Sequence, residues 1–210
     1  MPPFHALRTR PRTASAALAL AAALAVGGCS SGSDSSTPST APSSAPSSSG
    51  GTPEVRTQVV LGKVAGNLHQ PNRRIFKKYR KHLQQHVGKA VDAWFDGAFV
   101  GVDYPRDAFP TAFTSFTSAA RREARHQQQL MTNWKWRHDI DGVVVKKRKV
   151  SLDVLAPNGR PAGVTARVHL RFTTTGDVKK KVTVSGRLFL ARDPHGKWRI
   201  FGYDVAKGAR

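Results

Sequence analysis

The sequence contains few acidic residues and almost no cysteine. Of its 210 residues, 13 are Asp or Glu and 34 are Lys or Arg, so the formal net charge is +21. The one cysteine has no partner within the chain, which excludes a small scaffold held together by disulfides. Only one stretch is apolar and long enough to be considered for a bilayer, so an obligately membrane-embedded protein is excluded as well. The length suits one globular domain with extensions.

The first residues have the pattern of an export signal. Arg8, Arg10 and Arg12 give a positive start with no acid nearby, and residues 14–26 form an apolar stretch built mainly of Ala and Leu. That stretch is shorter than the roughly 20 residues that span a bilayer. Thr9 separates two of the arginines, so the adjacent arginine pair of the twin-arginine export pathway is absent.

The end of the apolar stretch carries a more specific pattern. Val26-Gly27-Gly28-Cys29 resembles the lipobox of bacterial lipoproteins, in which small residues precede the cysteine that becomes lipidated. The resemblance implies that residues 1–28 are a lipoprotein signal peptide and that Cys29 carries lipid such as palmitate. It also implies a protein anchored to the cell membrane on its extracytoplasmic face. An ordinary signal peptide, cut near Gly28, is the alternative.

Residues 29–53 have the composition of a disordered tether that begins at the lipidated cysteine. Serine accounts for 11 of the 24 residues from 30 to 53, and Thr, Pro and Gly for most of the others. Without large apolar side chains, such a segment cannot offset the entropy lost on ordering. Removing residues 1–28 takes away three arginines and no acid, which lowers the net charge from +21 to +18. The excess positive charge therefore belongs to the predicted domain, residues 54–210.

Two helices are predicted at the start of this domain. Apolar residues at spacings of three and four predict the first helix, with Asn72 as its N-cap and Gly97 and Gly101 near its end. Residues 118–132 are predicted as the second helix, and residues 59–68 are open between a short strand and a helical turn. The apolar face of the first helix consists of Ile75, Tyr79, Leu83, Val87, Val91, Trp94 and Ala98.

From Val143 onward the apolar period changes to two, which predicts strands. Four alternating segments are separated by the turn sequences Pro157-Asn158-Gly159, Thr175-Gly176-Asp177 and Asp193-Pro194-His195-Gly196. Short connections between four strands predict an antiparallel meander with one apolar and one polar face. The predicted fold class is α+β, with N-terminal helices packed on a four-stranded antiparallel meander.

This order of elements resembles the NTF2-like (cystatin-like α+β cone) superfamily, and in particular its small secreted or membrane-anchored members from actinobacterial envelopes. The residues that carry the resemblance are Val91-Asp92-Ala93-Trp94-Phe95, the aromatic loop around Tyr104 and the final segment Trp198-Arg199-Ile200-Phe201-Gly202-Tyr203. The resemblance implies a cone with a pocket between sheet and helices. The superfamily contains isomerases, dehydratases and many non-enzymes, so the fold alone gives no function.

The sequence offers little catalytic or metal-binding chemistry. His82 and His86 lie one helical turn apart, a spacing that suits a metal, but Leu83 stands where zinc proteases have Glu and no third ligand is evident. A solvated helix flank is therefore the favoured interpretation, and neither a metal nor another cofactor is predicted. Because the only cysteine lies at position 29, a cysteine enzyme is excluded. No catalytic residue is assigned.

A pocket in the cone is the other candidate site. Its candidate residues are Trp94, Asp103, Tyr104 and Tyr203. In enzymes of the superfamily a carboxylate in that pocket can act as a base, and Asp103 beside Tyr104 is the candidate for such a role. No acid–base pair can be placed by spacing, so ordinary aromatic residues at the edge of the core are the favoured interpretation.

Basic residues are the strongest physical signal in the domain. Cations alternate along the polar face of the predicted sheet, and Lys146-Lys147-Arg148-Lys149 forms a run at the first long strand. Such a field attracts polyanions and anionic lipid surfaces with an affinity that falls with salt, whereas a merely solubilising surface is the alternative. The candidates for contact with an anionic surface are Arg167, Arg171, Lys179, Lys181, Arg187, Lys147 and Lys149.

The sequence therefore favours a membrane-anchored lipoprotein with a non-enzymatic binding or scaffolding role. Anionic lipid, wall polymer or an acidic protein is the expected partner of the basic surface. The alternatives are a pocket protein for an apolar ligand such as a lipid or steroid, and an isomerase- or dehydratase-like enzyme. Nucleic acid is an unfavoured partner for an exported protein, although Trp134-Lys135-Trp136-Arg137 interleaves aromatic and basic residues as single-strand binders do. Like charges on the sheet face favour a monomer over pairing through that face.

Overall fold

The structure, a computed structural model, describes residues 55–67, 69–101 and 103–210. The chain divides into two units, Met1–Ser48 and Ser49–Arg210. The predictions for the signal peptide, for lipidation at Cys29 and for the tether of residues 29–53 lie outside the described residues. Among those described, no helix has both the length and the apolar character needed to cross a membrane.

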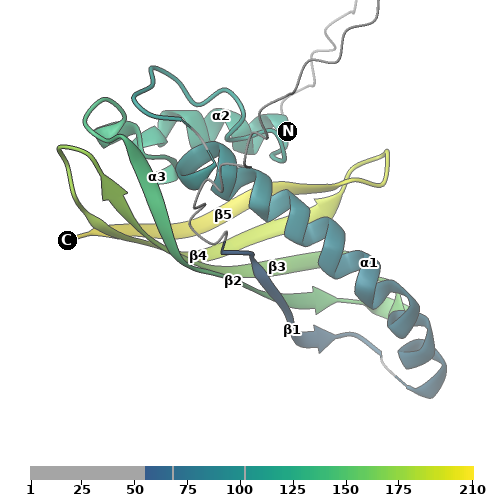
Figure 1. The fold of residues 1–210 in the computed structure, drawn as a ribbon. Helices are drawn as coiled ribbons and strands as arrows, with labels where there is room; N and C mark the ends of the chain where they lie inside the picture. The colour runs from purple at the N-terminus through teal and green to yellow at the C-terminus, as the bar shows by residue number, and fades with distance from the viewer. Residues whose placement is uncertain (1–54, 68, 102) are drawn as a thin grey trace, which may run out of the picture. The chain divides into compact units, whose positions relative to one another are not determined.

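One five-stranded sheet forms the frame of the described residues (Figure 1). Its strands follow one another in space in the order of the sequence, and β2 to β5 form an antiparallel meander. The strands are β1 (Gln58–Ala65), β2 (Gly142–Leu155), β3 (Gly163–Thr175), β4 (Lys181–Arg192) and β5 (Trp198–Ala209). The mixed α+β class and the meander were thus expected, but the prediction of four strands was wrong.

The additional strand is β1, which precedes the helices and pairs parallel with β2. Val59 lies opposite Val150 and Leu61 opposite Leu152, so these two side chains of β1 extend the apolar face of the sheet. Residues 59–61 are three apolar residues in a row, without the alternation that marks a half-buried strand. The segment left open between strand and helical turn is therefore a strand at the sheet edge.

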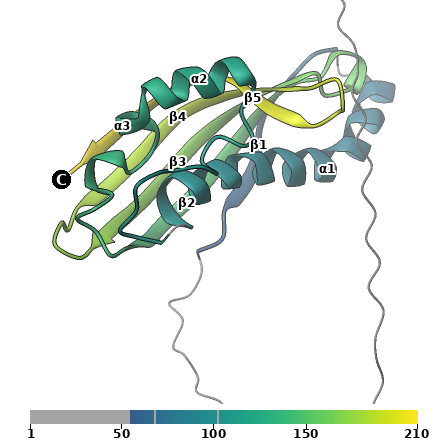
Figure 2. The same ribbon diagram turned by 90° about the horizontal axis from the view of Figure 1, so that it is seen from above.

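The helices lie on one face of the sheet, where α1 (Gln70–Phe95) crosses the strands (Figure 1). A π-helical turn, Asp96–Val100, continues α1 and ends at Gly101. The second predicted helix is divided into α2 (Ser118–His126) and α3 (Gln128–Met131), which lie beside β5 (Figures 1 and 2). Two 3-10 turns, Trp134–Trp136 and Pro157–Gly159, precede and follow β2.

The start of α1 differs from the prediction. His69 is the N-cap residue and makes no side-chain capping bond, whereas Asn72 lies inside the helix. Asn72 is buried and its side-chain amide donates to the backbone oxygen of Asn67. The side chain of Asn72 is therefore hydrogen-bonded to the loop before the helix and does not cap a helical N–H group.

The core lies between the helices and the inner face of the sheet, and it is rich in aromatic rings. Trp94, Phe95, Phe99, Phe116 and Phe172 are all fully buried or nearly so. The core cluster and the apolar side chains packed against it come from residues 59–205 alone. The unit Ser49–Arg210 thus contains the whole described core and can fold as a domain.

A buried ion pair joins the inner face of β2 to the end of α1. Arg148 is 9% exposed and donates to Asp92 at 2.9 Å and to Asp96 at 2.8 Å. Its guanidinium also lies 5.6 Å from the ring centroid of Phe95. Within the basic run of residues 146–149, Arg148 therefore does not share the exposed position of Lys147 and Lys149. Strand alternation turns Arg148 inward between Lys147 and Lys149, and a bulge at Lys146 leaves Lys146 and Lys147 both exposed.

Candidate functional site

The outer face of the sheet, opposite the helices, carries the cations predicted to contact an anionic surface. Alternation brings one residue in two to this face, and the paired strands place those residues in rows. Lys147 pairs with Arg171, Lys149 with His169, and Arg167 with Arg187. Six of the seven predicted residues, Lys147, Lys149, Arg167, Arg171, Lys181 and Arg187, lie on this face as exposed residues.

Lys179 is the exception, because β4 begins only at Lys181. Lys179 lies in the connection between β3 and β4, where the neighbouring Val178 donates its N–H to the backbone oxygen of Asp139. The sequence pattern extended β4 back to Val178, since that apolar residue fits the alternating period. Lys179 is exposed but does not belong to the ordered rows of the sheet face.

Ion pairs in the middle of the outer face neutralise two of the predicted cations. Arg167 donates to Asp153 at 2.7 Å, and Arg187 forms an ion pair with Asp204. Asp153 also accepts the N–H of Lys63 at 2.9 Å, and this hydrogen bond is the main cause of its lowered pKa. We call Asp153, Arg167, Arg187 and Asp204 the paired belt. Because each arginine has its own carboxylate, the belt carries no net charge.

One end of the outer face, beyond the belt, is purely basic. A depression of about 710 Å³ lies there between β2, β3, β4 and the end of β5. Its charged lining residues are all basic, and none of its described lining residues is acidic. We call this the cationic end, defined by Lys146, Lys147, Lys149, His169, Arg171, Lys181 and Arg210.

The pKa of His169 reflects the positive charge around it at the cationic end. Partial burial lowers its pKa, and the positive charges of Lys147, Arg171 and Lys149 lower it further. A neutral imidazole can accept or donate a hydrogen bond, while its protonated form adds another positive charge to the depression. This end of the face therefore becomes more positive when His169 is protonated.

The opposite end of the outer face is apolar. A second depression, of about 350 Å³, is lined mainly by apolar or small residues, among them Leu155, Gly163, Phe189, Ala191 and Phe201. The rings of Phe189 and Phe201 lie side by side with centroids 6.3 Å apart. We call this depression, with its Leu155 and Phe201 walls, the apolar end. The outer face is therefore amphipathic along its length.

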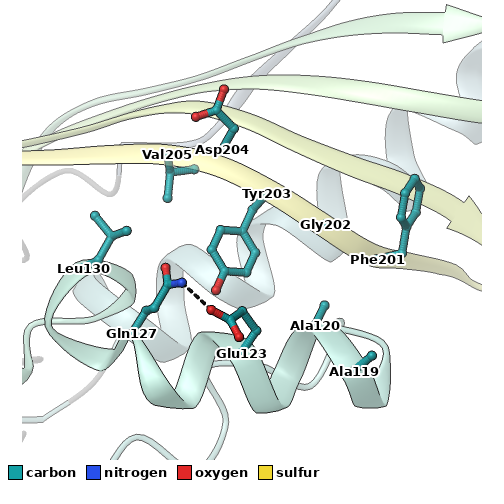
Figure 3. A pocket seen from close by; sticks show the side chains of 10 residues that line it. All are labelled: Ala119, Ala120, Glu123, Gln127, Leu130, Phe201, Gly202, Tyr203, Asp204 and Val205. Carbon is teal, nitrogen blue, oxygen red and sulfur yellow. Dashed lines mark hydrogen bonds between the residues drawn. The ribbon is translucent and has the colours of Figure 1, made fainter.

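A groove between α2 and β5 is the third concave feature, with a volume of about 520 Å³ (Figure 3). Glu123 of α2 and Gln127, the residue that ends this helix, are hydrogen-bonded to each other on one side, and Tyr203 points from β5 toward them. Burial, with a smaller contribution from the charge of Glu123, raises the pKa of Tyr203 to about 12. The phenol stays protonated near neutral pH, so Tyr203 can donate a hydrogen bond there but does not supply a base.

The four predicted pocket residues do not form one site. Trp94 is fully buried against Phe99 and Phe116, and its indole N–H donates to Met131 O at 3.1 Å. Tyr203 lines the groove beside α2, whereas Asp103 is exposed in the loop after the π-helical turn. Trp94 is therefore a core residue.

Tyr104 has a structural role between two segments of the chain. Its hydroxyl donates to Phe99 O at 3.1 Å and accepts from the Asn133 amide at 2.9 Å. Burial raises the pKa of Tyr104 to about 12, although the hydrogen bond with Asn133 and the charge of Arg106 act in the opposite direction. Because this phenol stays protonated and hydrogen-bonded, Tyr104 does not serve as a catalytic base beside Asp103.

The two remaining motifs are the histidine pair of α1 and the segment of residues 134–137. The rings of His82 and His86 lie 3.9 Å apart on the exposed side of α1, and the described residues contain no group of three or more potential metal ligands. Trp136 is buried, and Arg137 lies over the half-buried ring of Trp134 at 3.8 Å. These indoles are packed against the protein and do not form an exposed stacking surface for bases.

Comparisons of the chain with models of protein families, with curated proteins and with solved structures find no match. The resemblances to bacterial lipoproteins and to the NTF2-like superfamily therefore stay predictions.

Sequence reasoning missed the two acidic partners in the paired belt and the apolar end. Asp153 and Asp204 each alternate with core residues of their strands, so their place on the basic face was detectable. Leu155 and Phe201 each follow a buried residue, Val154 or Ile200, so the same alternation could have placed them on the outer face, where their side chains are about half exposed. Arg148 shares the even-numbered period of Val150 and Leu152, a signal that could have placed it inside.

Proposed function

We propose that this protein is an extracytoplasmic, lipid-anchored binding protein whose NTF2-like domain holds a phosphate-bearing anionic component of the cell envelope. The role is non-enzymatic, and the ligand binds on the outer face of the sheet at the cationic end. The observation that carries the proposal is the depression lined by Lys146, His169, Arg171, Lys181 and Arg210 without an acidic neighbour in its lining.

The charge distribution supports a site over a uniformly solubilising surface. Near the middle of the face, Arg167 and Arg187 have carboxylate partners, so their charge is compensated. At the cationic end, Lys147 lies opposite Arg171, a pair of like charges that is unfavourable in a free sheet. An anion placed over the depression removes that repulsion, which makes its binding favourable there.

The depression also has the form expected for extended anions. It is open on the sheet face, and its cations come from β2, β3, β4 and from Arg210, which follows β5. An elongated polymer or a row of lipid headgroups can therefore contact several cations at once. Each phosphate neutralised by Lys or Arg releases counterions, so affinity falls steeply as salt rises.

The test is the binding of labelled polyphosphate to the domain Ser49–Arg210 over a salt series, followed by fluorescence anisotropy. The variant Arg171→Ser/Lys181→Ser removes two charges from the cationic end. The matched control, Lys77→Ser/Lys78→Ser, removes two charges from exposed positions of α1. We expect the first variant to lower the slope of log Kd against log salt by about two and the control to leave the slope nearly unchanged. Equal effects of both variants would show that only net charge matters and would refute the site.

A further inference from the structure

We infer that the outer sheet face docks as a whole on an anionic lipid bilayer, with the apolar end inserted among the lipids and the cationic end on the headgroups. This inference rests on the proposed function, because it uses the same cationic end. It goes further by identifying the ligand as a membrane surface and by giving the apolar end a role.

Exposed apolar side chains are concentrated on this one face. Among the described residues, the large apolar side chains with the greatest exposure are Val60, Leu155 and Phe201, at 40%, 54% and 55%. Val60 pairs with Ser151, next to Arg167, and thus lies on the outer face of the sheet edge. Leu155 and Phe201 border the apolar depression of the same face. An exposed apolar cluster beside charged residues is typical of surfaces that bind proteins or membranes.

The apolar depression has room for a hydrocarbon group because its floor is made of small residues. On β3, Gly163 lies between Leu155 of β2 and Ala191 of β4. Gly163 has no side chain and Ala191 only a methyl group, so the space between Leu155 and Phe189 remains open, with a volume of about 350 Å³. An acyl chain or the methylene groups of a lipid can fill this space and remove the apolar walls from water.

The length of the face favours a membrane over a soluble polyanion. Gly163 at the apolar end and Arg171 at the cationic end lie eight positions apart on β3, which corresponds to about 26 Å. A wall polymer offers anions to the cationic end but no apolar partner to Leu155 and Phe201. A bilayer offers both headgroup charge and hydrocarbon at every point of its surface.

The paired belt between the two ends is compatible with contact at the headgroup level. Its arginines and aspartates are matched in charge, and both arginines and Asp204 are exposed enough to remain hydrated. A second copy of this chain is a poorer occupant. A copy would place its own cations either on the cationic end, where they repel, or on the apolar end, where they lose water without a partner.

The experiment uses the domain Ser49–Arg210 and vesicles of phosphatidylglycerol and phosphatidylcholine in equal amounts, with pure phosphatidylcholine vesicles for comparison. Co-sedimentation gives the partition coefficient. The variant Leu155→Ser/Phe201→Ser is expected to bind the anionic vesicles about tenfold more weakly, because two half-exposed apolar side chains no longer insert. The conservative variant Leu155→Met/Phe201→Leu is expected to keep the wild-type partition coefficient. Affinity for polyphosphate should be the same in all three proteins.

A labelled variant keeps the inference testable if the serine variant does not fold. The domain Ser49–Arg210 contains no cysteine, so Leu155→Cys introduces a unique site for an environment-sensitive fluorophore. We expect a blue shift and stronger emission with anionic vesicles, and neither change with polyphosphate. An unchanged spectrum in the presence of bound vesicles would overturn the inference.

The other outcomes separate this inference from the proposed function. Binding of polyphosphate without binding of anionic vesicles would overturn membrane docking and leave the cationic site in place. Failure to bind either probe at low salt would overturn both. A dimer that becomes monomeric in Leu155→Ser/Phe201→Ser, measured by sedimentation equilibrium, would show that a second copy covers this face and would also overturn the inference.

Discussion

The guanidinium of Arg148, buried on the inner face of β2, donates a hydrogen bond to the carboxylate of Asp96 at 2.8 Å. Asp92, one turn earlier on α1, accepts a second bond from the same guanidinium at 2.9 Å. The two carboxylates are still 34% and 46% exposed, so water reaches them while the arginine is enclosed. This arrangement connects the end of the long helix to the strand that carries Lys147 and Lys149 on its other face.

Removing the arginine is expected to destabilise the domain. Arg148→Met leaves two neighbouring carboxylates without a counter-charge, and breaking a buried pair costs about 3 kcal/mol at the lower end of the usual range. The lower end of that range applies because the carboxylates remain partly hydrated. Urea unfolding of Ser49–Arg210 measures the loss.

The control for this prediction is Arg167→Met, which breaks an ion pair on the exposed face of the same sheet. Arg167 is 59% exposed in its side chain, and an exposed pair contributes about 1 kcal/mol or less. If the two variants lose equal free energy of unfolding, Arg148 does not have the stabilising role described.

Lys207 is expected to give the domain an alkaline pH dependence of stability. It extends from β5 toward α3, where its ammonium donates to Gln129 O and, at 2.6 Å, to Thr132 O. Burial, with the charge of Lys135 in addition, lowers the pKa of Lys207 from 10.5 to about 8. Between these two values the unfolded chain holds the proton and the folded chain has released it. Stability therefore increases with pH in this window.

The measurement is the free energy of unfolding of the wild type minus that of Lys207→Met, at a series of pH values from about 7 to 10. This difference cancels the titration of the other groups. It should be flat below pH 8 and then rise by up to about 1.4 kcal/mol per pH unit. A difference that stays constant over the whole range would contradict the buried environment of Lys207.

Much of the fold could be predicted because the responsible signals are local. The faces of α1 and of the meander follow from periods of 3.6 and 2. Gly159, Gly176 and Gly196 have positive φ and lie within the predicted turn sequences. The missing strand, β1, depends on a parallel pairing with residues about ninety positions later in the chain. Such pairing leaves no local pattern.

The sequence predicted the positive charge of the candidate site but not which of its cations are paired with carboxylates. Period two placed Arg167, Arg171 and Arg187 on one face, but the sequence did not show which of them have acidic partners. The partners come from neighbouring strands, so register decides that Asp153 reaches Arg167 and that Asp204 reaches Arg187. The connection between β2 and β3 sets the first of these registers. A bulge in β5 beside Phe189 sets the second, and a bulge depends on tertiary packing.

His169 is expected to make binding at the cationic end pH-dependent. Its pKa lies below the ordinary 6.5, through burial and through Lys147, Arg171 and Lys149. A bound polyanion favours the protonated ring and raises this pKa, so affinity should increase as pH falls through the window between the free and bound values. Polyphosphate titrations at fixed ionic strength, between about pH 5 and 7.5, measure the effect.

The control is His169→Gln, which keeps a polar side chain without the titration. The other histidines titrate equally in both proteins, so the difference in log Kd isolates position 169. We expect the variant to show a shallower rise in affinity toward acid pH. Parallel curves for both proteins would mean that the bound polyanion does not reach His169.

The turn between β2 and β3 is expected to tolerate no side chain where it meets α1. Gly159 has φ of 76°, and a Cβ there would lie 2.2 Å from the backbone oxygen of Asn72. Gly159→Ala adds left-handed strain to a clash with backbone atoms, which should cost about 3 kcal/mol or more. Gly196→Ala is the matched control, since φ is 75° and nothing lies within 4 Å of the added carbon. It should cost only about 1 kcal/mol. Urea unfolding compares the two variants, and equal losses would show that the turn does not pack against the start of α1.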